Sequence, residues 1–218
     1  MFIKNLIILA ESAKFNNYCV AGVDVDSGRW IRPICEKPEL EDAVPLDDLK
    51  YPDGSRVELL DVVEIKFSDR AAKNPIQPEN FFYNQKYFWQ KVGRVTLQEV
   101  IDERGFDFCD EIFYNHNRSI MGVDVIKFHD RESLLLLPVE NLFISIEDRE
   151  DHKKFFADFN YGSKNFQRFS VGDIAVRNKF ADSGAGKHFF KEKAAVVFSL
   201  TNPYHKNAEC YKMLAQIF

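Results

Sequence analysis

Short apolar runs separated by turn residues follow one another along most of the chain. Residues 2–10 are almost continuously apolar, and the apolar stretches 19–25 and 29–34 flank an Asp-Ser-Gly turn, which is typical of a hairpin. Later runs with the same character cover residues 56–67, 133–147, 159–180, 194–204 and 210–218. This pattern predicts many short strands.

Only one segment carries a clear helix signature. Thr96 precedes Glu99 by three residues, as in a capping box, and Gly105 follows the apolar positions of the segment. We therefore expect a mostly β protein with one short helix between strands. Two small five-stranded barrels in tandem fit the length, the first at residues 1–130 with a helical insertion near 96–104 and the second at residues 131–218.

Composition narrows the classes of function. The net charge of −5 and the pI near 5.6 argue against coating nucleic acid through overall charge, so charge has to be considered locally. The four cysteines and five histidines lack the spacing of a metal site or a catalytic triad, so we expect no metal, no cofactor and no catalytic residue. No apolar run is long enough for a membrane span, and we expect a cytoplasmic protein.

The most basic window is 164–193, with seven Lys or Arg against three Asp or Glu. Phenylalanines alternate with its cations, and a cationic groove with stacking aromatics is how single strands of nucleic acid are held. We take Arg177, Lys179 and Lys187 as candidate contacts. The alternative is that the phenylalanines are core residues and the lysines a solvated face. Residues 85–94 repeat the signal more weakly, with Phe88 expected in the core.

The hairpin places Trp30 and Arg32 on one face of its second strand, and Pro33 directly follows Arg32. A rival catalytic pattern lies downstream. Asp53, Glu64 and Lys66 match the PD-(D/E)xK order, in which carboxylates bind a divalent metal and the lysine steadies the attacking water. A metal-dependent nuclease is therefore one alternative.

Several stretches together resemble the dual OB-containing domain family of bacteria. They are ILAESAK, YCVAGVDVDSGRWIRPI, LLDVVEIKF, IQPEN, LPVENLFISI, VFSLTNP and CYKMLAQIF, which span the chain from end to end. The resemblance implies two oligonucleotide-binding barrels, a nucleic-acid-binding or sensing role in bacterial conflict and defence, and no catalytic centre. Carried over residue by residue, it points to Lys14, Trp30, Arg32, Gln77, Glu79 and Asn80.

Two roles remain open for this last set. Trp30 and Arg32 would offer a stacking plane beside a phosphate-binding fork. Alternatively, Trp30 caps the barrel and Arg32 pairs with Glu79 to hold the loop in place.

The leading hypothesis is a non-enzymatic module that binds single-stranded DNA or RNA, with an effector protein as a possible further partner. The other alternative is an adaptor that binds a partner protein or a nucleotide signal. The acidic loop at residues 36–50 favours that alternative, because it would repel phosphates. The sequence predicts no particular oligomeric state.

Overall fold

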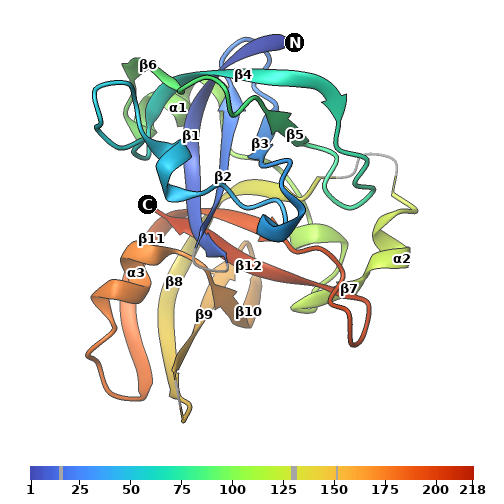
Figure 1. The fold of residues 1–218 in the computed structure, drawn as a ribbon. Coiled ribbons are helices and arrows are strands. Elements are labelled where there is room, and N and C mark those ends of the chain that lie inside the picture. Colours follow the sequence, from blue (N-terminus) through green and yellow to red (C-terminus); the bar gives the residue numbers. More distant parts are fainter. Residues whose placement is uncertain (15–16, 129–131, 151) are drawn as a thin grey trace. The chain divides into compact units, whose positions relative to one another are not determined.

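The computed structural model describes residues 1–14, 17–128, 132–150 and 152–218, which fold mainly into strands (Figure 1). Contacts divide the chain into two compact units. Unit 1 contains residues 1–74 and 78–105, and unit 2 contains residues 75–77 and 106–218. The chain thus leaves unit 1 for three residues and returns to it.

The main division between the units lies at residues 105 and 106. The sequence pattern placed it between residues 130 and 131, which lie outside the described residues. Residues 106–128 group with unit 2 because Ile112, Phe113 and Val125 are buried in its core.

Unit 1 is built on a ring of five strands. Its strands are β1 (Phe2–Lys14), β2 (Asn17–Asp24), β3 (Trp30–Ile34), β4 (Asp61–Ala71), β5 (Asn80–Tyr83) and β6 (Gln90–Arg94). They follow the order β1-β2-β3-β5-β4-β6, and β4 also pairs with β1, which closes the first five into a barrel. The β3–β5 pair is parallel and the other pairs are antiparallel.

Two local features of unit 1 follow directly from its sequence. Gly28, at φ 66°, ends the predicted turn between β2 and β3, and its amide donates to the Asp24 carbonyl at 2.8 Å. Gly22 allows β1 and β2 to approach closely, since a Cβ there would lie 2.4 Å from the Ile7 carbonyl oxygen. Any larger residue at Gly22 would force the two strands apart.

The expected helix is present as α1 (Leu97–Arg104). The Thr96 hydroxyl accepts from the Glu99 amide at 3.2 Å, and the Glu99 carboxylate accepts from the Thr96 amide at 2.6 Å. Gly105, at φ 77°, follows the last helical residue. Two 3-10 helices, Pro38–Leu40 and Leu46–Leu49, lie in the acidic loop between β3 and β4.

Unit 2 repeats the same strand order. Its elements are β7 (Ser119–Met121), α2 (Gly122–Val125), β8 (Leu134–Asp148), β9 (Lys153–Tyr161), β10 (Lys164–Val171), α3 (Ile174–Lys179), β11 (Gly186–Leu200) and β12 (Glu209–Ile217). Strands β8-β9-β10-β12-β11 correspond to β1-β2-β3-β5-β4, with the parallel pair again between the third and fifth strands. The expected mostly β fold is confirmed, and α2 and α3 are two short helices that the pattern did not predict.

Aromatic side chains fill the core of unit 2. The Phe159 ring centroid lies 5.3 Å from that of Phe169, 5.3 Å from that of Phe198 and 5.5 Å from that of Phe166. Each of the four side chains is at most 1% exposed. Ring packing of this kind fixes β9, β10 and β11 relative to one another, and their opposite faces form the outer surface of the unit.

Candidate nucleic-acid interface

Arg32, Glu79 and Asn80 meet inside unit 1. Parallel pairing of β3 with β5 sets Arg32 beside Asn80. The Arg32 Nη1 lies 3.0 Å from Glu79 Oε1 and donates to Asn80 Oδ1 at 3.2 Å, while the Arg32 amide donates to the Glu79 carbonyl at 2.9 Å. Arg32 is 5% exposed and Glu79 8%, so this charge pair is buried and mutually compensated. The structure thus forms the Arg32–Glu79 pair of the structural alternative.

Trp30 lies partly exposed at the start of β3. The Arg104 guanidinium carbon sits 5.3 Å from the centre of its ring, and the Arg104 Nε donates to the Gly28 carbonyl at 2.9 Å. This cation–π contact joins the end of α1 to the hairpin. One face of the Trp30 ring is therefore already engaged within unit 1.

The remaining candidates from the family resemblance, Lys14 and Gln77, make other contacts. Lys14, at the end of β1, donates through Nζ to the Glu41 carbonyl. Gln77 belongs to unit 2, where its buried amide donates to the Leu200 carbonyl at 2.9 Å. The motif Gln-Pro-Glu-Asn is thus divided between the two units.

In the basic window at residues 164–193, some phenylalanines are core residues and at least one is exposed and accessible for stacking. Phe166, Phe169 and Phe180 are core residues, whereas Phe189 is 60% exposed. Of the cations on α3, Arg177 lies 5.7 Å from the Phe155 ring centre and Lys179 4.8 Å from that of Phe190. The charged groups of Arg177 and Lys179 thus form cation–π contacts within unit 2.

Lys187 belongs to a cluster on the outer face of four neighbouring strands. Its Nζ lies 2.7 Å from the Asp158 carboxylate and 4.7 Å from the centre of the Phe143 ring, which in turn meets Phe189 edge-on at 5.4 Å. The Arg168 amide donates to Asp158 at 2.9 Å, and its guanidinium carbon lies 4.5 Å from the Phe156 ring centre. We call Phe143, Phe156, Asp158, Arg168, Lys187 and Phe189 the outer cluster.

Carboxylates hold the cations of the outer cluster in place. Arg168 Nη1 pairs with Glu147 at 2.5 Å, and Glu147 also pairs with Arg149 at 3.0 Å. The hydrogen bond from Arg168 is the main reason that the pKa of Glu147 lies below its usual value, against an opposing effect of desolvation. Both arginines are about half-exposed, so a phosphate would compete with Glu147 in water. Glu147 thus holds the two guanidinium groups in place, and both groups stay accessible to a ligand.

Sequence reasoning identified Lys187 and missed Phe143, Phe156 and Asp158. Leu142, Ile144 and Ile146 are buried in β8, and Phe143 occupies an alternate, outward position. Alternation indicated the face of such a residue, but which outward aromatics from separate strands meet depends on the strand register. That register was not evident from the sequence.

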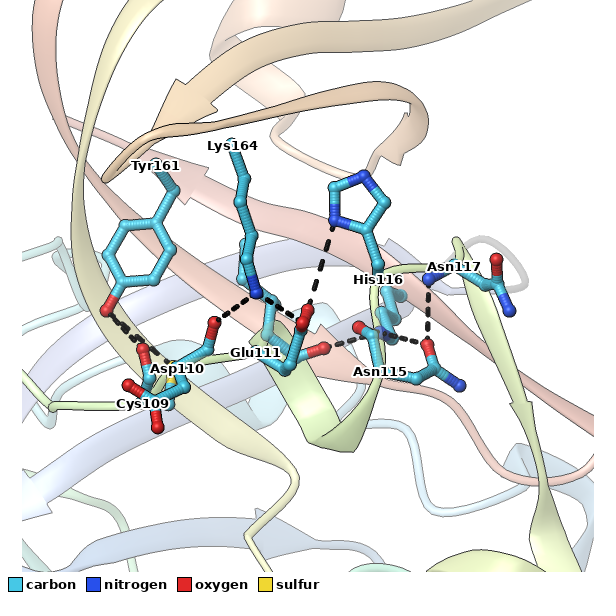
Figure 2. Close-up of polar contacts among 10 residues, drawn as sticks. Cys109, Asp110, Glu111, Asn115, His116, Asn117, Tyr161 and Lys164 are labelled. Atoms are coloured by element: carbon cyan, nitrogen blue, oxygen red, sulfur yellow. Dashed lines mark hydrogen bonds and ion pairs between the residues drawn. The ribbon is translucent and has the colours of Figure 1, made fainter.

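A second missed feature is the segment 109–117, which is fixed by long-range polar contacts. Figure 2 shows Tyr161 and Lys164 pointing from the β9–β10 hairpin toward Cys109, Asp110 and Glu111. The Tyr161 hydroxyl donates to the Cys109 carbonyl at 2.9 Å, and Lys164 Nζ donates to the Asp110 carbonyl at 3.1 Å and pairs with Glu111.

The buried Lys212 of β12 also contacts this segment. Its Nζ donates to the carbonyls of Ile112 and Asn115 and to Asn115 Oδ1. Its three hydrogen-bond donors are all used, which is what burial of an ammonium group requires. Burial nevertheless lowers the pKa of Lys212 to about 7.

Asp53, Glu64 and Lys66, the residues of the nuclease alternative, are found in two different elements. Glu64 and Lys66 lie on β4, and Lys66 Nζ is 4.2 Å from the Tyr87 ring centre. Asp53 lies in a turn, where its carboxylate accepts from the amide and hydroxyl of Ser55 at 2.9 and 2.6 Å. Within the described residues, no group of three or more His, Cys, Asp or Glu side chains is placed to hold a metal ion.

One further expectation was wrong. Phe88, expected in the core, is 61% exposed, and its neighbour Trp89 is buried instead, with its ring centre 5.6 Å from that of Tyr83. Adjacent positions of an extended segment face opposite ways, so only one of the two aromatics fits inside.

In the described parts of the chain, no helix combines the length and apolar content that a membrane span requires. The model of the family described as the dual OB-containing domain matches residues 4–217. No curated protein and no solved structure was found to match the chain.

Proposed function

Because the chain belongs to the dual OB-containing domain family, we propose that it is a non-enzymatic module that binds single-stranded DNA or RNA through the outer cluster of unit 2. OB folds are binding modules whose second and third strands present the ligand face. In unit 2 these strands are β9 and β10, which carry Phe156, Asp158 and Arg168.

One observation carries this proposal: the exposed Phe189, the half-buried Phe143 and Phe156, and neighbouring cations contact one another across that face. Phe189 and Phe143 offer ring surfaces for stacked bases, and Lys187 and Arg168 lie beside them for phosphates. In unit 1 the corresponding strands bury Arg32 in an ion pair, so the proposal places the main contact on unit 2. Arg177 and Lys179 of α3 would add attraction for the phosphate backbone.

The direct test is fluorescence anisotropy with labelled single strands of DNA and RNA at about 50 and 200 mM salt. Affinity should fall steeply with salt as bound cations are released from the strand. Phe189→Ala should cost about 1–3 kcal/mol of binding free energy, the usual contribution of one stacked base. Phe88→Ala is the matched control, because Phe88 is equally exposed, at 61% against 60%, but lies on unit 1.

Loss of affinity in Phe88→Ala and not in Phe189→Ala would move the contact to unit 1. Absence of binding at the lower salt concentration would favour the adaptor alternative, which rests on the exposed acidic side chains of the loop at 36–50. We place the module in a bacterial conflict system with a partner effector, which co-purification from the native host tests.

We also propose that the chain has no catalytic centre. Incubation of labelled DNA or RNA with the protein and magnesium or manganese should leave the strand intact. Cleavage that disappears in Glu64→Ala would establish the nuclease alternative instead.

A further inference from the structure

A cavity of about 620 Å³ lies in unit 2 at the tip of the β9–β10 hairpin. It is lined by Phe108, Cys109, Asp110, Pro138, Glu140, Asn160, Tyr161, Gly162, Ser163 and Lys164. The polar contacts of Tyr161 and Lys164 hold the segment 109–111 against the hairpin (Figure 2). One wall of the cavity is therefore formed before any ligand arrives.

The apolar lining suits a flat ring. Phe108 is 90% exposed, which is unusual for a large apolar side chain and leaves most of its surface open to a ligand. The Pro138 and Tyr161 rings line the same cavity. An unstacked base enclosed by such rings would recover the stacking that it loses on leaving its neighbours.

The polar lining includes two carboxylates that can accept hydrogen bonds from a ligand. The Glu140 carboxylate forms no hydrogen bond or ion pair with another residue that the structure describes, and Asp110 adds a second carboxylate. The only ammonium group in the lining, that of Lys164, is already paired with Glu111. These charges repel a phosphate and favour a ligand edge that carries N–H groups.

The cavity continues the outer cluster along the same strands. Glu140 pairs with Asn160 across β8 and β9, and the next pair along those strands is Phe143 with Asp158, both members of the outer cluster. A strand of nucleic acid lying on the outer cluster along β8 and β9 would thus meet the cavity next.

We propose that this cavity binds one unstacked guanine of the nucleic-acid strand, with its ring on Phe108 and its N1–H and N2–H₂ donated side by side to the Glu140 carboxylate. Guanine fits because its Watson–Crick edge offers two adjacent donors to one carboxylate, whereas thymine and uracil offer a single N–H between two repelled carbonyls. The inference rests on the proposed function and adds base specificity to it.

The test compares nine-nucleotide thymidine strands with a single central guanine, inosine, adenine or thymine. Guanine should bind roughly 5- to 100-fold more tightly than thymine, as for one bidentate base contact. Inosine, which lacks the N2 amino group, should lose most of that gain. Glu140→Gln should abolish the guanine preference with little change for thymine, and Glu192→Gln is the charge-matched control at an exposed position of β11 outside the cavity.

A second variant separates stacking from hydrogen bonding. Phe108→Ala should weaken guanine binding, and Phe108→Trp should retain it, because only the ring is needed. Equal affinity for all four strands would overturn the guanine site while leaving the proposed function intact. Failure of every strand to bind would overturn both. If instead an arginine-rich peptide binds and Glu140→Gln abolishes that binding, the cavity serves a cationic partner chain and the guanine assignment is wrong.

Discussion

The buried ion pair between Arg32 and Glu79 should contribute to the stability of unit 1. Arg32→Ala should lower the free energy of unfolding by about 3–5 kcal/mol, because it leaves the Glu79 carboxylate buried without its cation. Adding Glu79→Gln should recover part of the loss, and the two substitutions should therefore show strong coupling in urea denaturation.

Arg29→Ala is the matched control for that measurement, since Arg29 is an exposed arginine of the same hairpin. Unchanged stability in Arg32→Ala together with lost oligonucleotide binding would show that the guanidinium serves a ligand rather than the barrel.

Lys212 predicts how the stability of unit 2 depends on pH. Burial lowers its pKa to about 7, whereas a lysine in an unfolded chain titrates near 10.4. Between those values the unfolded state binds more protons than the folded state, so Lys212 makes stability rise as the pH increases from about 7 to about 10. Glu111 and Cys109 oppose the shift through their charges.

Lys212→Met should remove this rise, which urea denaturation at a series of pH values measures. It should also cost about 1–3 kcal/mol for each acceptor left without a donor, the carbonyls of Ile112 and Asn115 among them. Lys206→Met, at an exposed position, should leave the pH profile unchanged. Parallel profiles for the wild type and Lys212→Met would contradict the assignment.

Single residues also show where prediction from the sequence stopped. The pairing of Arg32 with Glu79 was one of two alternatives, because a buried ion pair would explain an arginine next to a proline at the rim of a barrel. Phe88 was expected in the core, whereas its neighbour Trp89 is the buried one, because adjacent positions of an extended segment face opposite ways. Phe143 and Phe189 carried no local signal of their contact, which is created by pairing of β8 with β11.

At the scale of elements, α1 was predictable because its ends are encoded locally. Thr96, Glu99 and Gly105 lie within ten residues and need no tertiary contact to cap the helix. By contrast, α3 begins at Asp173, whose carboxylate accepts from the Val176 amide and also from Gln216 and Ile217 of β12. Two of these three hydrogen bonds come from β12, which is distant in the sequence, so the local pattern did not reveal the cap.

The cap of α1 supplies a further prediction. Thr96→Ala removes the acceptor for the Glu99 amide and should lower the free energy of unfolding by about 1 kcal/mol. Gln98→Ala, at an exposed position inside the helix, should change it far less. A loss of equal size in both variants, measured by urea denaturation, would mean that the cap contributes nothing specific.

For the whole molecule, the mostly β class followed from the spacing of apolar runs, and the tandem arrangement from that spacing and from the family resemblance. The division between the units did not, because it depends on contacts distant in the sequence. Residues 106–128 were expected to belong to the first barrel, yet Ile112 and Phe113 are core residues of unit 2. Residues 75–77 likewise belong to unit 2 although β4 and β5 on either side of them belong to unit 1.

Because residues 75–77 belong to unit 2 but lie within the sequence of unit 1, the two barrels are not encoded by two separate stretches of the gene. A fragment of residues 106–218 would lack Ile76, which is 3% exposed in the core of unit 2, and Gln77, the donor to the Leu200 carbonyl. No single cut in the polypeptide yields both units whole. Recombination that exchanged one barrel between relatives would therefore have to carry a short stretch from the middle of the other barrel with it, which favours inheritance of the pair as one unit.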